Sequence, residues 1–345
     1  MAAENPFARL FQKPTVRLAA LEPGQADDPI KIRIINADPQ NTLYKCISYD
    51  RSKEFDSEHV DVDGQPLPIS KPLVEALHAF RDPQNTCNIW ADLLIGRTDE
   101  ERSTQAREMK AVFEHAVEVA AWLGPGSKQD DAAMDMIQTL ANKWSQVQVE
   151  FNLPASMTRA TLQQLGNAQA WMADRLDQFQ PSNKPLWDAI YKIFCTGYFN
   201  TTQSIPEMVL AKTPVVKIGK SSVSFKDFAF ASSAFLMLFP SLQLKAEPDI
   251  LESFQRIQAI RTATRRKADG ESLELFPMMR DARKTVFKDP REIVFSVLPI
   301  STPCTRTEKH PMRPSLPTAD YSKSAIEVLK QASKYVIEDR QDTLM

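Results

Sequence analysis

Short apolar runs separated by longer amphipathic segments make up the first third of the chain. The runs are rich in Val, Ile and Leu and are bounded by turn residues, which is typical of strands inside a sheet. Two of them enclose Asp63-Gly64, a dipeptide that favours a tight hairpin turn. The pattern predicts strands at 30–36, 43–49, 60–69 (both strands of the hairpin), 88–94 and 119–124.

The segment after the hairpin carries the signals of a helix. Ser70 is a candidate N-cap, because a hydroxyl can accept a hydrogen bond from an N–H in the first turn. Pro72 follows in that turn, where its fixed backbone angle fits. Leu73, Leu77 and Phe80 recur at helical spacing, so this helix should bury one face.

A second helix is predicted from about Thr98 to His115. Thr98 and Glu101 have the spacing of a capping box, in which the two side chains satisfy backbone N–H groups at the helix start. Strands that alternate with helices predict a mainly parallel sheet covered on both faces. We therefore expect an α/β fold for this part of the chain.

After residue 127 the pattern changes to long amphipathic segments. It predicts helices at 128–150, 158–179, 184–196, 226–238, 248–266, 271–283 and 322–338, and a β-hairpin at 213–225. The segment 299–321 is rich in Pro, Thr and Ser and is predicted to be a surface loop. The expected organisation is an N-terminal extension (1–27), an α/β core (28–126) and a mostly helical half (127–345) packed on that core as one unit.

Composition excludes several classes of function. A net charge of −2 does not favour a nucleic-acid partner. The chain has 9 Gly and neither a GxGxxG nor a GxxxxGK[ST] motif, so neither standard nucleotide loop is expected. The N-terminus has no signal-peptide pattern, and the apolar run at 228–239 is too short to span a bilayer. We expect a cytoplasmic protein with no membrane partner.

The cysteines and histidines give no metal signal. Cys46, Cys87, Cys195 and Cys304 lack CxxC spacing, and the four histidines are dispersed, so reduced structural thiols and no metal are expected. Nothing in these patterns indicates a cofactor.

A cluster of four cations lies in one predicted helix. Its members are Arg261, Arg265, Arg266 and Lys267. The cluster is interpreted as a solvated helix face, with an anion site as the alternative.

Several stretches occur in the order typical of one protein family. They are CISY (46–49), VDVDGQPLPISKPLVEALHAFR (60–81), IWADLL (89–94), DEERSTQAREMKAVFEHAVEVAAWLGPG (99–126), PEMVLAKTPVVKIGKSSVSFKDF (206–228), DPREIVFSVLPI (289–300) and TADYSKSAIEVLKQASKYVI (318–337). Over residues 42–338 the chain resembles the fungal heterokaryon-incompatibility (HET) domain. The resemblance implies a HET-like mainly parallel sheet flanked by helices, distantly similar to the TIR fold.

The chain departs from the family pattern at three places. The Trp-Gly expected after Tyr49 is replaced by residues 50–52, and the Cys-Ile-Asn-Gln turn by the shorter 95–97. The Arg-x-Trp and Gln expected ahead of Glu207 are replaced by 201–203 and Pro206. The residues that match are Trp90, Asp92, Glu101, Arg102, Gln105 and Glu207. We interpret this as a retained scaffold with a degenerate site.

The resemblance to TIR domains implies a role for Glu207. Some TIR domains cleave NAD with one glutamate, whose carboxylate would bind the ribose hydroxyls and stabilise an oxocarbenium-like transition state. Asp92 is the second candidate, since it ends a strand at the edge where open α/β sheets place ligands. For both acids a structural role, at a helix start or in an ion pair, is the alternative. The residues expected to line the pocket at this corner are Ser48, Tyr49, Asp50, Arg51, Arg97, Glu101 and Arg102.

Two functions follow from the resemblance. The first is an allorecognition or cell-death protein that acts by association with a protein partner or a second copy. The second is an enzyme built on the same scaffold, which either retains NAD cleavage or binds another small molecule in a fungal biosynthetic pathway. A deep apolar pocket with a few convergent polar groups would favour the enzyme.

Overall fold

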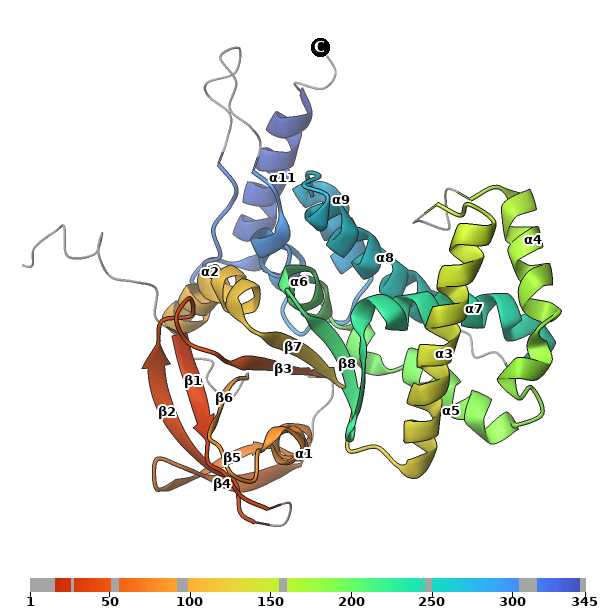
Figure 1. Cartoon of the computed structure of the whole chain (residues 1–345). Coiled ribbons are helices and arrows are strands. Elements are labelled where there is room, and N and C mark those ends of the chain that lie inside the picture. The colour runs from red at the N-terminus through yellow and green to blue at the C-terminus, as the bar shows by residue number, and fades with distance from the viewer. Residues whose placement is uncertain are drawn as a thin grey trace, which may run out of the picture.

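Nine strands form one mixed sheet in the described part of the chain (Figure 1). This computed structural model describes residues 16–25, 28–50, 56–91, 99–154, 160–242, 244–245, 250–303 and 315–341. In spatial order the strands are β5 (Gln65–Ser70), β4 (Ser57–Val62), β2 (Lys31–Ala37), β1 (Val16–Leu21), β6 (Cys87–Trp90), β3 (Lys45–Tyr49), β7 (Glu118–Trp122), β8 (Pro214–Ile218) and β9 (Ser221–Ser224).

The centre of the sheet is parallel and its flanks are mixed. Strands β6, β3, β7 and β8 run side by side in the same direction. On one flank β1 pairs antiparallel with both β6 and β2, and on the other β9 pairs antiparallel with β8. The predicted parallel sheet is thus confirmed for its central block, and the carboxyl ends of these four strands meet at one edge.

Strand β1 was not predicted, and it lies inside the sheet rather than at its border. Its sequence, VRLAAL, belongs to the segment expected as an N-terminal extension. Five of its six residues are buried, so it shows no polar and apolar alternation that would mark a strand. Contact with β2 and β6, which the sequence does not reveal, decides its conformation.

The two hairpins were predicted and are confirmed. β4 and β5 are joined by Asp63 and Gly64, whose φ angles are +52° and +79°. Two successive positive φ values match the turn whose twist suits an antiparallel pair. The second hairpin, β8–β9, turns at Gly219 with φ +55°, where a Cβ would collide with the backbone of Pro125. Only glycine fits that close approach.

The longer helices follow the predicted segments closely, whereas the short helices Ser204–Leu210 and Glu292–Phe295 lie outside the predicted ranges. The helices are α1 (Lys71–Phe80), α2 (Asp99–His115), α3 (Lys128–Glu150), α4 (Leu162–Ala173), α5 (Lys184–Phe194), α6 (Ser204–Leu210), α7 (Phe225–Leu242), α8 (Ile250–Ala268), α9 (Leu275–Ala282), α10 (Glu292–Phe295) and α11 (Ala325–Gln341), with 3-10 turns η4 (Leu176–Phe179), η5 (Gly197–Asn200) and η6 (Leu298–Ile300). Within the described ranges, no helix is both long and apolar enough to cross a membrane.

The sheet separates two cores. On one face α1 covers a small core that includes Ile47, Tyr49 and Trp122. On the other face lie α2 and α6, and the helical half extends the larger core, which includes Cys46 (Figure 1). Because successive residues of a strand point to opposite faces, Ser48 points to the same side as Cys46 and away from Tyr49.

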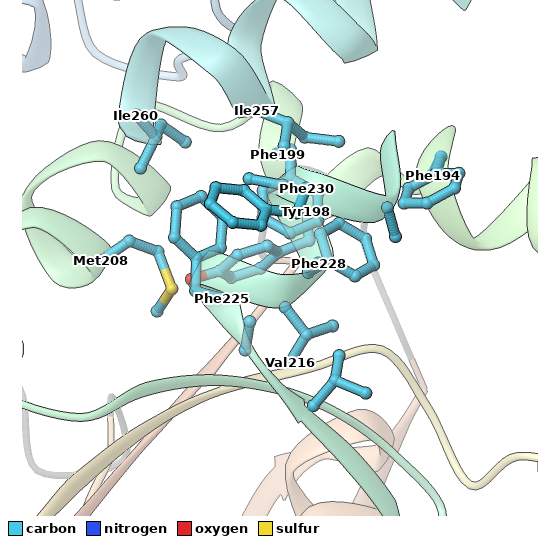
Figure 2. Close-up of a cluster of buried hydrophobic side chains, with 14 of the residues drawn as sticks. Phe194, Tyr198, Phe199, Met208, Val216, Phe225, Phe228, Phe230, Ile257 and Ile260 are labelled. Atoms are coloured by element: carbon cyan, nitrogen blue, oxygen red, sulfur yellow. The ribbon is translucent and has the colours of Figure 1, made fainter. Parts of the chain in front are cut away.

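Aromatic rings fill the centre of the helical half. Phe194 contacts Phe228 at a centroid distance of 4.9 Å, and Phe199 stacks on Phe228 at 5.3 Å (Figure 2). Phe194 also contacts Phe254 at 5.3 Å. Such offset and edge contacts are favourable beyond the area that they bury. They connect α5, η5, α7 and α8 to one another, and thereby fix the position of the short helix α6 against the sheet.

Candidate functional site

Glu207 is a carboxylate buried inside the protein. It lies in the first turn of α6, a helix of seven residues that are all buried, and none of its surface is exposed. An acid at this position is favoured by the partial positive charge of the helix start. Burial of a carboxylate without partners would be strongly unfavourable, so its hydrogen bonds decide what it does.

Two hydroxyl groups donate to the same oxygen of Glu207. Ser48 Oγ donates to Oε2, and the Tyr198 hydroxyl donates to Oε2 at 3.3 Å. Ser48 comes from the carboxyl end of β3, and Tyr198 from η5. Strand β3 and two consecutive segments far from it in sequence, η5 and α6, therefore meet at one carboxylate, on the sheet face that α6 covers.

Asp50 lies next to this cluster. A Cβ atom built at Gly197 would collide with Asp50 Oδ2, so the carboxylate occupies the space that any other residue at 197 would need. Gly197 is the first residue of η5 and directly precedes Tyr198. The Asp50 carboxylate thus packs against the backbone directly before Tyr198.

Tyr49 lies on the opposite face of the sheet. It is 9% exposed and belongs to the core beneath α1. Its hydroxyl accepts a hydrogen bond from Ser70 Oγ at 3.0 Å. Ser70 precedes α1 as predicted, but its side chain makes no capping hydrogen bond there. The structure thus separates Tyr49 from Ser48 and Glu207.

Cys46 is a buried thiol on the same face as Ser48. Burial, and secondarily the negative charge of Glu207, raise the pKa of Cys46 well above its ordinary value. Since the thiolate is the reactive form, this thiol is held in its inert state. Cys87 and Cys195 are half-buried, and Cys304 lies outside the described residues.

A pocket of about 370 Å³ opens at the carboxyl edge of β6. Its lining includes Trp90, Gln105 and Gln203, and it extends to residues 286–289 and Tyr321. Glu207 and Ser48 are not among the residues that line it. The pocket therefore lies beside the buried carboxylate without reaching it.

Arg102 connects several charges on one wall of this pocket. Its guanidinium lies 3.5 Å from Asp289 and 3.9 Å from Glu292. It also lies 3.9 Å from the ring centroid of Tyr321, a cation–π contact. The Tyr321 hydroxyl donates to Glu292 at 2.5 Å. Burial, and then the charge of Glu292, raise the pKa of Tyr321, which therefore stays protonated and keeps this hydrogen bond.

Asp289 is held by a second arginine as well. The Arg291 guanidinium lies 2.7 Å from Asp289 and also donates to the Tyr321 and Lys323 carbonyls at 2.5 and 2.9 Å. Burial opposes ionisation of Asp289, but hydrogen bonds from the Arg291 side chain and backbone, with the charges of Arg291 and Arg102, outweigh it and lower the Asp289 pKa. This network joins α2 and α10 to the segment before α11.

Four predicted site residues stay untested predictions. Asp92, Arg51 and Arg97 lie outside the described residues, and so does the side chain of Glu101 in α2. The capping box of Thr98 and Glu101 is outside them for the same reason. Of the described predicted residues, the structure brings Ser48 and Glu207 together, places Asp50 against Gly197, and places Arg102 at the neighbouring pocket.

Tyr198 and Gly197 were not predicted as site residues. A tyrosine between an amphipathic helix and a polar segment carries no sequence signal of its own. Asp289, Glu292 and Tyr321 lie within the DPRE and TADY segments that resembled the family, and that was the signal that could have found them. Within the described ranges there is no group of three or more His, Cys, Asp or Glu side chains that could hold a metal ion.

Part of the chain matches the model of a known protein family. Residues 44–186 match the family model described as "Heterokaryon incompatibility protein (HET)", which confirms the resemblance over that range. The match includes Ser48, Asp50 and Arg102 but ends before Tyr198 and Glu207. No curated protein and no solved structure matches the chain.

Proposed function

We propose that this is a heterokaryon-incompatibility-type protein that functions in allorecognition or regulated cell death by associating with a protein partner or a second copy. The match of residues 44–186 to the HET family model supports this proposal. In this proposal the counterpart of the TIR glutamate, Glu207, is a structural residue, and NAD cleavage is absent. One observation supports it above the others: Glu207 is fully buried, with two hydroxyl groups on its Oε2.

A glutamate that cleaves NAD has to reach the ribose. Hydrogen-bond reach between the catalytic group and the substrate is a requirement of such chemistry. For a ribose hydroxyl to bind Glu207 Oε2, it would have to displace the Ser48 or Tyr198 hydroxyl from a site without exposed surface. That exchange leaves a buried donor unpaired, which is costly. The geometry thus favours a carboxylate that joins β3, η5 and α6.

The neighbouring pocket favours the same interpretation. Three of the four charged residues that line it are paired with one another, Arg102 with Asp289 and with Glu292, and the fourth is Lys288. Arg291, which does not line the pocket, also pairs with Asp289. Acidic and basic side chains that form ion pairs with one another stabilise a tertiary contact, and they are then less available to bind a charged substrate.

The first test separates a structural Glu207 from a catalytic one. Purified protein is incubated with NAD and nicotinamide release is followed over hours, beside Glu207→Gln and a matched surface variant, Glu150→Gln. We expect no turnover in any of the three. Turnover that vanishes in Glu207→Gln but persists in Glu150→Gln would overturn the proposal.

The second test addresses the cellular role. The chain is expressed from an inducible promoter in a filamentous fungus, as wild type and as Glu207→Gln, with protein amounts matched. We expect both to arrest growth to the same extent, because the proposed association does not need the acid. Normal growth with the wild type would contradict a cell-death role. Growth arrest by the wild type but not by Glu207→Gln would indicate that Glu207 takes part in the mechanism.

An enzyme acting on another small molecule is the second candidate. Gln105 favours it, because the residue lines the 370 Å³ pocket and its buried Oε1 has no hydrogen-bond partner among the residues that the structure describes. An unpaired buried acceptor would suit a donor on a bound molecule. A compound that co-purifies with the wild type and is lost when Met109→Trp fills the pocket would favour this candidate. If no compound co-purifies with the wild type, this candidate is excluded.

A further inference from the structure

A second pocket lies at the other end of α6. Gln203, just before the helix, lines the 370 Å³ pocket, whereas Val209 and Leu210 at its carboxyl end line one of about 1170 Å³. This second pocket also adjoins Pro214, the first residue of β8. It is therefore separate from the carboxyl edge of the sheet and from the site at Glu207.

The floor of the larger pocket is apolar. Phe225 and Phe230 line it from α7, and both are buried in the aromatic cluster of the helical half (Figure 2). Val209, Leu210 and Leu153 complete the apolar lining. Ligand pockets for small molecules have volumes of about 300–1000 Å³ and mostly apolar walls, so this hollow is large enough for an extended apolar ligand.

The rim of this pocket is cationic. Five cations line it, namely Lys212, Lys226, Arg261, Arg265 and Lys267. Two of them have acidic partners: Arg265 lies 3.1 Å from Asp269, and Lys267 lies 3.0 Å from Glu114. Among the residues that the structure describes, the other three form no ion pair.

Arg261 and Lys226 converge on one aromatic ring. The Arg261 guanidinium lies 4.3 Å from the centroid of Phe230, and Lys226 Nζ lies 5.4 Å from it. Arg261 also donates a hydrogen bond to Gln258 at 3.2 Å, a neutral acceptor. Burial, and then the charge of Arg265, lower the pKa of Arg261 to about 10, so the group stays charged at neutral pH. A partly desolvated cation without a counter-charge is stabilised when an anion binds beside it.

The basic run of α8 is therefore divided. Arg266 is directed to Glu271, at 3.0 Å, and does not line the pocket, so it fits the solvated face expected from the sequence. Arg261, Arg265 and Lys267 line the pocket instead, but Arg265 and Lys267 have the acidic partners given above. The alternative interpretation of this run, an anion site, thus applies to Arg261.

We propose that this pocket binds an amphiphilic anion, with a carboxylate or phosphate head group at Arg261 and Lys226 and an apolar chain against Phe225, Phe230 and Val209. The cationic rim and the apolar floor lie on the same hollow, which suits a molecule with one charged end. Carboxylate and phosphate share the chemistry that a guanidinium recognises, two acceptor oxygens in a plane.

The test uses the full chain and three probes of equal chain length, each below its micellar concentration. Dodecanoate and dodecyl phosphate carry the two head groups, and 1-dodecanol is the neutral control. Binding is measured by isothermal titration calorimetry. We expect saturable binding of at least one anion at one site, and binding of the alcohol at least about tenfold weaker, because the charge-assisted hydrogen bonds are lost. The stronger of the two anions identifies the head group.

Three variants locate the site. In Arg261→Gln/Lys226→Gln we expect affinity for the anion to fall about tenfold or more, while Arg280→Gln on α9, which removes one charge elsewhere, leaves it unchanged. Thr264→Trp, on the pocket side of α8, should block binding without removing a charge. Circular dichroism verifies that each variant is folded.

Several outcomes would overturn the proposal. They are no saturable anion binding to the wild type, equal affinity for the alcohol, equal losses in Arg280→Gln, and unchanged binding in a folded Thr264→Trp.

Discussion

Ser48 donates a hydrogen bond to Glu207 across 159 positions of sequence, and this contact joins the central strand of the parallel block to the short helix α6. The Tyr198 hydroxyl donates to the same oxygen. A fully buried carboxylate held in this way makes a tertiary contact strong and specific, since loss of either donor leaves a charge-bearing group short of partners.

Ser48→Ala should therefore destabilise the fold. Removing one hydrogen bond to a buried carboxylate costs about 1.5–3 kcal/mol. Urea unfolding gives the free energy of unfolding, and Ser221→Ala is the matched control, because its hydroxyl donates to Asp131 in an exposed hydrogen bond of 2.7 Å. We expect less than about 1 kcal/mol for the control. Equal effects in the two variants would contradict a special role for the Ser48 hydroxyl.

Gly197→Ala tests the close approach of Asp50. The added Cβ would collide with Asp50 Oδ2, so we expect a loss of about 1–3 kcal/mol in unfolding free energy. Gly166→Ala is the control, since nothing lies near its Cβ position inside α4. That change should stabilise the protein by up to about 1 kcal/mol. If Asp50→Ala does not reduce the cost of Gly197→Ala, the collision is not its cause.

The lowered pKa of Asp289 predicts that the stability of the fold depends on pH. Its pKa is lower in the folded protein than its ordinary value of 3.8, so the unfolded chain binds the proton more tightly. The stabilisation is therefore present above about pH 4 and is lost as pH falls through the folded pKa. Thermal unfolding at pH 7 and at pH 3 measures it. Asp289→Asn should lower the melting temperature at pH 7 and show a smaller further loss at pH 3, whereas the same pH dependence as the wild type would exclude Asp289 as a source.

Cys46 should resist alkylation in the folded protein. Its thiol is buried and its pKa is raised by that burial, whereas Cys87 is half-buried. We expect iodoacetamide at pH 8 to modify Cys87 at least about tenfold faster than Cys46, with the difference disappearing in 8 M urea. Peptide mass spectrometry gives the rate at each site, and comparable rates in the folded protein would contradict the burial of Cys46.

The sequence by itself determined the elements whose signals are local. Helix α3 spans 128–150 as predicted, with Ser127 as its N-cap, because helical periodicity and a capping hydroxyl act within a few residues. The hairpin at Asp63-Gly64 follows from backbone preferences of those two residues. The HET resemblance over 42–338 also rests on sequence order alone, and the family match confirms it over residues 44–186.

Only the tertiary structure decided what depends on partners far along the chain. Strand β1 lies between β2 and β6 because pairing, not its own pattern, makes it a strand. Ser48 and Tyr49 are neighbours in sequence, yet the alternation of a strand directs them to different cores. Likewise Glu207 was a catalytic candidate from the sequence, but folding brings Ser48 and Tyr198 onto its Oε2 and encloses it. The environment of a side chain is a property of packing between distant segments, and no local pattern contains it.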